Sequence, residues 1–136
     1  MKRSSLVVSL ALALMFGPGG VGYALAMSTP ELLHNSVSSQ RLVPTSYADR
    51  FSLDIDSPSR VSISSESWGS IGVNMILKAR LLDQNGKPVS TAKQRGGNFV
   101  INETLGPGDY ILEVEGQELS DRVQTNNRYN VRTRIY

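Results

Sequence analysis

Apolar and polar residues alternate along most of this chain. Between residues 47 and 56 the apolar positions are Phe51, Leu53 and Ile55, and those between them are Ser52, Asp54 and Asp56. A period of two places successive side chains on opposite faces of a strand, so one face here is apolar and the other polar. The pattern predicts a half-buried antiparallel strand.

The same alternation predicts further strands. Residues 74–83 are rich in Met, Ile and Leu, which indicates a strand with a bulge, and residues 37–43 are expected to form an edge strand. Residues 27–33 are expected to be a short helical turn or a disordered arm. The other positions predicted to face the core are Val61, Ile63, Phe99, Ile101, Tyr110, Leu112, Val114, Tyr129, Val131 and Ile135.

Glycine and proline mark the turns between these strands. Asn85-Gly86 predicts a type I′ hairpin turn or a slightly longer loop of that kind, and Gly96-Gly97 predicts a second reversal. Pro107, Gly108 and Tyr110 indicate a tyrosine corner, in which the phenol packs inward and its hydroxyl bonds to a backbone group upstream. The residues assigned structural roles are therefore Asn85, Gly86, Pro107, Gly108 and Tyr110.

About eight strands joined by turns every 8–12 residues predict an all-β fold, a two-sheet antiparallel β-sandwich of jelly-roll type. The domain is expected to span residues 38–136, preceded by an N-terminal arm at residues 27–37.

Residues 1–26 have the layout of a secretory signal peptide. Lys2 and Arg3 precede an apolar run of 11 residues at 6–16, and Ala24-Leu25-Ala26 supplies small residues for cleavage after Ala26. A membrane-spanning helix needs about 20 apolar residues, so an uncleaved anchor is the weaker alternative. The protein is expected to be exported to the periplasm or the exterior, with no membrane span after cleavage.

Composition narrows the function classes. Cysteine is absent, which favours a bacterial protein that folds by packing without disulfides. Removing Lys2 and Arg3 leaves 14 − 2 = 12 basic residues against 12 acidic ones, so the net charge gives no reason to expect nucleic acid as a partner.

Catalytic and metal-binding constellations are weak. With one histidine, His34, and no cysteine, neither an enzyme nor a zinc site is expected, and no cofactor is implied. Asp54 and Asp56 lie two apart on one strand face and are weak calcium candidates. Glu113 and Glu115 share that spacing. The favoured interpretation of both pairs is a solvated polar strand face.

Trp68 is the most conspicuous candidate for binding. It lies in the polar segment 64–72, predicted to be a loop, and residues 117–127 form a second polar loop. An exposed Trp68 can stack on a sugar or anchor a protein interface, whereas a buried one would cap the core. The candidate ligand-binding residues are Trp68, Glu66, Arg122 and Asn126.

The order of these features resembles the bacterial pre-peptidase C-terminal domain family. The matching segments are YADRFSLDID, VSISS, MILKARLLDQNGKPV, NFVINETLGPGDYILEVEG and RYNVRTRIY. The resemblance implies a jelly-roll-like sandwich that accompanies secreted peptidases and aids secretion, solubility or substrate attachment. This chain departs from the family because it is expected to be the domain alone. Where members carry acidic calcium ligands, it offers Glu31, His34 and Asn35.

Two classes of function remain open. The first is an exported binding or accessory module that recognises a protein or glycan of the envelope or exterior through its loops. The alternative is an assembly protein that pairs through an edge strand or the N-terminal arm, or a periplasmic inhibitor or chaperone of a peptidase.

Overall fold

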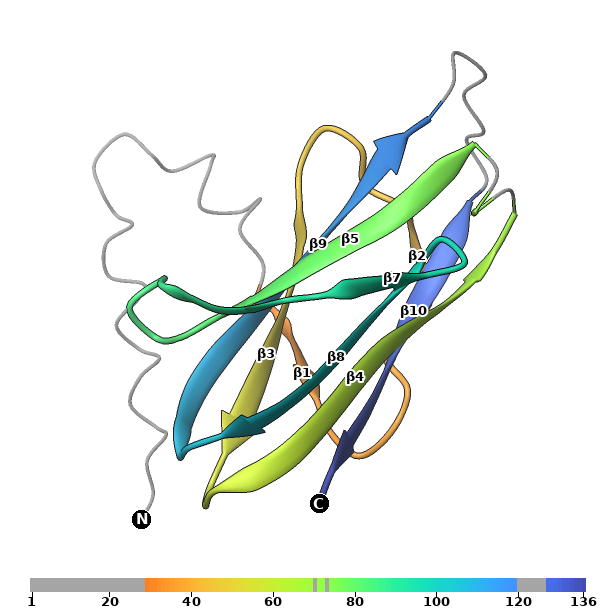
Figure 1. The fold of residues 1–136 in the computed structure, drawn as a ribbon. Helices are drawn as coiled ribbons and strands as arrows, with labels where there is room; N and C mark the ends of the chain where they lie inside the picture. The colour runs from red at the N-terminus through yellow and green to blue at the C-terminus, as the bar shows by residue number, and fades with distance from the viewer. Residues whose placement is uncertain (1–28, 70, 73, 120–126) are drawn as a thin grey trace, which may run out of the picture.

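The computed structural model describes residues 29–69, 71–72, 74–119 and 127–136, which form a β-sandwich of two five-stranded sheets (Figure 1). The predicted fold class is confirmed, with ten strands in the described residues instead of about eight. The strands are β1 (Glu31–Leu33), β2 (Arg41–Leu42), β3 (Asp49–Ile55), β4 (Ser59–Trp68), β5 (Met75–Leu82), β6 (Pro88–Thr91), β7 (Lys93–Arg95), β8 (Asn98–Leu105), β9 (Gly108–Glu118) and β10 (Arg128–Ile135).

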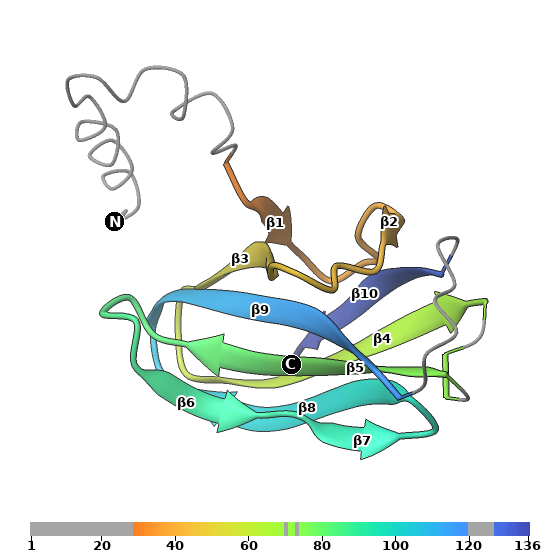
Figure 2. The same ribbon diagram turned by 90° about the horizontal axis from the view of Figure 1, so that it is seen from above.

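The two sheets are linked at both sides by the chain itself. Sheet A has the order β1-β3-β9-β5-β6, and sheet B has the order β2-β10-β4-β8-β7. The chain passes from sheet A to sheet B between β1 and β2 at one side and between β6 and β7 at the other (Figures 1 and 2). The four edge strands are two to four residues long, which limits the backbone available for pairing with another chain.

The core lies between the sheets and includes the positions that the alternation predicted. It also contains buried residues that were not predicted individually: Leu33, Leu77, Ala79, Leu81 and Leu105. Phe51 and Tyr129 are fully buried and meet edge to face, with ring centroids 6.4 Å apart. Tyr110 and Ile135 are partly buried against the same cluster. The other predicted core positions are all buried: Leu53, Ile55, Val61, Ile63, Phe99, Ile101, Leu112, Val114 and Val131.

The Asn85-Gly86 turn is the longer of the two predicted kinds. Only Gly86 has a positive φ there, +80°, so a type I′ turn is wrong for this pair. The Gly86 amide donates to the Asp83 carbonyl at 2.9 Å, and the Asp83 carboxylate accepts from the amides of Asn85 and Lys87. This side chain organises a longer loop. Gly96 and Gly97 both have positive φ, as a two-residue hairpin of type I′ requires.

The corner between β8 and β9 has the hydrogen bond of a tyrosine corner. The Tyr110 hydroxyl donates to the Gly106 carbonyl at 2.8 Å. Gly108 has a φ of +148°, which a side chain would disfavour. At this corner the chain passes from β8 in sheet B to β9 in sheet A, so the corner connects central strands of the two sheets.

Two local predictions were wrong. Glu31–Leu33 is a strand and not a helical turn or disordered arm; it pairs in parallel with β3 and buries Leu33. Residues 64–68 are not a loop but the end of β4, because β10 offers a partner to every residue up to Trp68, which lies opposite Arg128. In both segments cross-strand pairing outweighs the local sequence signal.

Candidate functional site

Trp68 lies at the end of sheet B in an exposed row of three residues. It is the last residue of β4 and lies opposite Arg128 of β10, which in turn lies opposite Leu42 of β2. Residues directly opposite each other in paired strands project to the same face. Trp68 is 48% exposed and Leu42 is 49% exposed, so Trp68 does not cap the core. We call Leu42, Arg128 and Trp68 the Trp68 row.

The backbone beneath this row is closely packed. Gly69 follows Trp68 with a φ of +101°, and a Cβ atom there would lie 2.1 Å from the Asn127 Oδ1 atom. Asn127 is buried, and its carbonyl accepts a hydrogen bond from the Val43 amide at 3.0 Å. The chain segments after β2, after β4 and before β10 therefore meet directly below the row. Trp68 therefore lies at the end of a strand, with closely packed backbone beneath it, and not on a long loop.

Glu66 shares the outer face of β4 with Trp68. Its carboxylate accepts a hydrogen bond from Arg132 Nε at 3.1 Å and lies 3.0 Å from Arg132 Nη2 as an ion pair. Both side chains are nearly half exposed, and an exposed pair of this kind is worth roughly 0.2–1 kcal/mol. The ion pair joins β4 to β10 on the outer face that also carries the Trp68 row.

The structure brings Trp68 and Glu66 onto one face, whereas Arg122 and Asn126 lie outside the described residues. Sequence reasoning missed Leu42 and Arg128 as neighbours of Trp68. The alternation of β10 placed Arg128 on the outer face, but the register that sets it beside Trp68 comes from the pairing of distant strands. No pattern in the sequence around Leu42 indicated that it would lie near Trp68.

Of the two calcium candidates, Asp54 lies on the outer face of sheet A opposite Asp109. Asp56 lies beyond the end of β3, so the prediction that both carboxylates share one strand face is wrong. Among the described residues, no three or more His, Cys, Asp or Glu side chains are grouped in a way that could hold a metal ion. Glu31 and Asn35 are already engaged: Glu31 binds Ser39 and Arg41, and the Asn35 Oδ1 atom accepts a hydrogen bond from the Ile135 amide.

Glu113 does not form the solvated face predicted for it. Its carboxylate lies 2.6 Å from Arg50 Nη2 and 2.8 Å from Arg80 Nε, and its side chain is 10% exposed. Arg50, Glu113 and Arg80 are cross-strand neighbours in β3, β9 and β5, so the two arginines cover the carboxylate. The alternation placed Glu113 on the outer face correctly, but pairing on both sides removes it from water.

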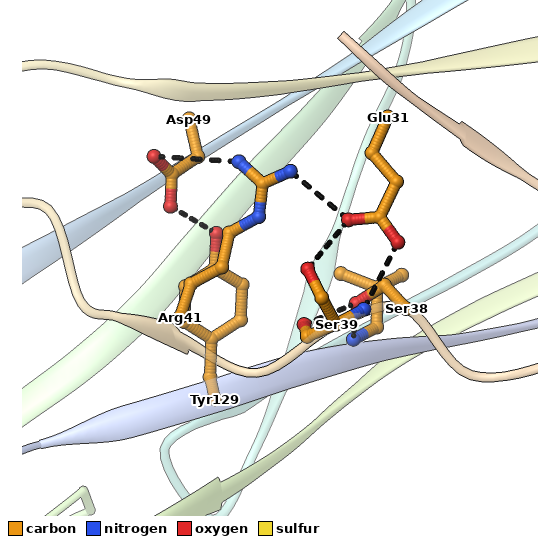
Figure 3. Close-up of polar contacts among 7 residues, drawn as sticks. Glu31, Ser38, Ser39, Arg41, Asp49 and Tyr129 are labelled. Atoms are coloured by element: carbon orange, nitrogen blue, oxygen red, sulfur yellow. Dashed lines mark hydrogen bonds and ion pairs between the residues drawn. The ribbon is translucent and has the colours of Figure 1, made fainter.

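A polar network closes the side of the sandwich formed by β1, β2, β3 and β10 (Figure 3). Arg41 Nη2 donates to Glu31 at 3.0 Å, and Arg41 Nη1 lies 3.9 Å from Asp49. The Arg41 guanidinium also lies 4.3 Å from the centre of the Phe51 ring, a cation–π contact. The buried Tyr129 hydroxyl donates to Asp49. These contacts join the N-terminal segment to both sheets.

Two groups in this network have shifted pKa values. Burial alone would raise the pKa of Glu31, but hydrogen bonds from the Ser39 amide, the Ser39 hydroxyl and Arg41 outweigh it and hold the pKa below 4.5. Burial raises the pKa of Tyr129, and its hydrogen bond to the Asp49 carboxylate raises it further. The lowered pKa keeps Glu31 ionised and the raised pKa keeps the Tyr129 hydroxyl protonated, as their hydrogen bonds require. Both residues therefore have a structural role in the network.

The comparison with solved structures gives a match along most of the chain. The crystal structure of the pre-peptidase C-terminal domain of a collagenase from Bacillus anthracis superposes with a TM-score of 0.60, covering 79% of this chain and 97% of that one. The fold is that of a pre-peptidase C-terminal domain. The resemblance drawn from the sequence is therefore confirmed for the fold. At 13% identity the likeness extends no further.

Two other comparisons found nothing: no protein-family model matches the sequence, and no curated protein matches it. In the part of the chain that the structure describes, no helix has the length and apolar character needed to cross a membrane.

Proposed function

We propose that this protein is an exported bacterial binding module, without catalytic activity, that recognises a protein or glycan of the cell envelope or exterior. The Trp68 row is the observation that carries the proposal. Every inward-facing large apolar residue of β4 is buried, yet Trp68 at its end is 48% exposed beside an exposed leucine and an exposed arginine.

The chemistry of the row suits a binding contact. Tryptophan and arginine are enriched at the residues that dominate binding energy, because each combines a large contact area with a polar group. Leu42 adds an exposed apolar side chain on the other side of Arg128. The packed Gly69–Asn127 contact below the row limits the conformational entropy that binding would cost.

Export and the lack of catalysis rest on other observations. The pattern of residues 1–26, which lies outside the described residues, supports export. The pre-peptidase C-terminal fold and the scarcity of histidine and cysteine support a role in binding. The arm is a less suitable donor to another chain, because Glu31–Leu33 already pairs with β3 and Arg41–Leu42 with β10. No observation favours the inhibitor or chaperone hypothesis.

Fluorescence tests the proposal directly, because Trp68 is the single tryptophan of the sequence. Adding fractionated envelope glycans and envelope proteins should shift or quench its emission with at least one fraction. Trp68→Ala should weaken capture of that fraction about tenfold or more, the range of a dominant interface residue. Tyr47→Ala is the matched control, since Tyr47 is an exposed aromatic residue between β2 and β3. Unchanged emission with every fraction, or equal losses for both variants, would contradict the proposal.

A further inference from the structure

The outer face of sheet B is strongly cationic. In the described residues, the outward positions of β4, β7 and β10 hold six arginine or lysine side chains, all exposed, against one acidic residue, Glu66. The six are Arg60, Lys93, Arg95, Arg128, Arg132 and Arg134. Since Glu66 pairs with Arg132, the face keeps five positive charges in excess.

These charges are spread along the strands and not gathered at one point. At about 3.4 Å per residue, Arg128 and Arg132 are roughly 14 Å apart along β10, and Arg134 lies roughly 7 Å further. The positions between the charges carry hydroxyl and amide groups, which donate and accept hydrogen bonds: Ser62, Ser64, Asn102 and Asn130.

Aromatic residues lie at both ends of this face. Trp68 is at one end of β4. At the other end, the Arg60 guanidinium lies 5.8 Å from the centre of the Tyr136 ring, which is 69% exposed. A shallow depression of about 390 Å³ opens there, and its lining includes Arg60, Ser62, Tyr136 and one acidic residue, Glu103, which accepts a hydrogen bond from the Ser90 hydroxyl.

The excess of positive charge is a property of this face, because residues 27–136 as a whole hold equal numbers of basic and acidic residues. The outer face of sheet A carries Asp54, Asp109, Glu113 and Glu115 against Arg50, Lys78 and Arg80. Glu113 is paired there on both sides, and Lys78 lies opposite Glu115. The outer face of sheet A is thus mixed and nearly balanced, whereas that of sheet B carries an excess of positive charge.

We propose that the outer face of sheet B binds an acidic polysaccharide, a ligand class that rests on the proposed function and narrows it. Separated cations attract carboxylate or other anionic groups repeated along a polymer, and the hydroxyl and amide groups between them can bond to sugar hydroxyls. Trp68 and Tyr136 offer rings that stack on sugars.

Nucleic acid fits this face less well. Five strands at about 4.8 Å spacing span roughly 19 Å, wider than the major groove of about 12 Å that admits a two-stranded ribbon. Bases of a single strand stack in succession on aromatic side chains, whereas the middle of this face carries Ser62, Ser64 and Asn102.

The test compares carboxymethyl-dextran with unmodified dextran, which share one backbone and differ in charge. The protein should bind the carboxymethylated chain with a change in Trp68 emission, lose affinity as salt is raised, and ignore the neutral chain. Arg128→Gln/Arg134→Gln should weaken binding about tenfold, because the variant loses two of the five charges in excess on this face. Lys78→Gln/Lys87→Gln removes the same charge elsewhere, from sheet A and the β5–β6 turn, and should leave binding nearly unchanged.

Each other result overturns the inference. Equal weakening by the two double variants would mean attraction by overall charge without a defined face. Tighter binding of a single-stranded oligonucleotide of equal charge would assign the face to nucleic acid. If neither dextran binds while envelope fractions still shift Trp68 emission, the acidic-polysaccharide assignment falls and the proposed binding function stands; if nothing shifts it, both fall.

Discussion

Glu31 is the residue that ties the first described strand to the rest of the sandwich. Its carboxylate accepts from the Ser39 amide at 2.9 Å, the Ser39 hydroxyl at 2.7 Å and Arg41 at 3.0 Å (Figure 3). Arg41 in turn covers the Phe51 ring and approaches Asp49. A single ionised side chain thereby orients the guanidinium that closes one side of the core.

Ionisation of Glu31 should therefore be visible in stability. Its pKa in the folded protein lies below the ordinary value of 4.5, so the ionised carboxylate stabilises the fold above that pH, and this contribution is lost as the pH falls through the lower, folded pKa. Glu31→Gln should lower the free energy of unfolding at pH 7 by roughly 1 kcal/mol, and the gap to the natural protein should close towards pH 3.

Urea denaturation at a series of pH values measures this gap. Glu118→Gln, an exposed position at the end of β9, is the control and should follow the natural protein at every pH. A gap that stays constant down to pH 3 would show that Glu31 acts through packing and not through its charge.

At the scale of elements, the sequence predicts strands well where alternation is sustained. The inward apolar residues of β3 and of the first half of β4 were all identified, because burial on one face leaves a period of two. In β8, Phe99 and Ile101 were identified and Leu105 was not. Strand β1 and the end of β4 were missed because their pairing partners, β3 and β10, are distant in the sequence. Trp68 was recognised from its residue type alone. Leu42 and Arg128 were not recognised as its companions, because the register that brings them together also depends on strands distant in the sequence.

The contact between the β7–β8 turn and the segment after β4 depends on glycine at two positions. Gly97 has a φ of +91°, and a Cβ atom there would lie 2.5 Å from the Gly72 backbone. Its carbonyl accepts from the Leu77 amide at 2.8 Å, so the turn is held against sheet A. Gly97→Ala has to strain φ and displace backbone atoms together, and we expect a loss of more than about 2 kcal/mol.

Gly86→Ala separates these two effects. Gly86 has a similar φ of +80°, but a Cβ atom there meets nothing within 4 Å. This variant should lose only about 1 kcal/mol, the cost of the backbone conformation alone. Thermal unfolding of both variants measures the difference, and equal losses would mean that the Gly97–Gly72 approach contributes nothing.

At the scale of the whole molecule, the charges balance in number but not in position. Residues 27–136 hold 12 basic and 12 acidic residues, so their formal net charge is zero. The net charge can be counted from the sequence, but the count does not reveal the excess of positive charge on sheet B. Which charged side chains share a face depends on the register between paired strands. A molecule of this kind presents a positive surface to a partner from one side and a mixed surface from the other.

Ion exchange tests this segregation without any ligand. At pH 7 and low salt, the protein without residues 1–26 should be retained on a cation-exchange resin despite its zero formal charge, because sheet B can face the resin. Added salt should release it, since screening acts over about 10 Å at 0.1 M. Arg128→Gln/Arg134→Gln should elute at lower salt than Lys78→Gln/Lys87→Gln, although both carry the same net charge. Co-elution of the two variants would show that the charge on sheet B does not act as one surface.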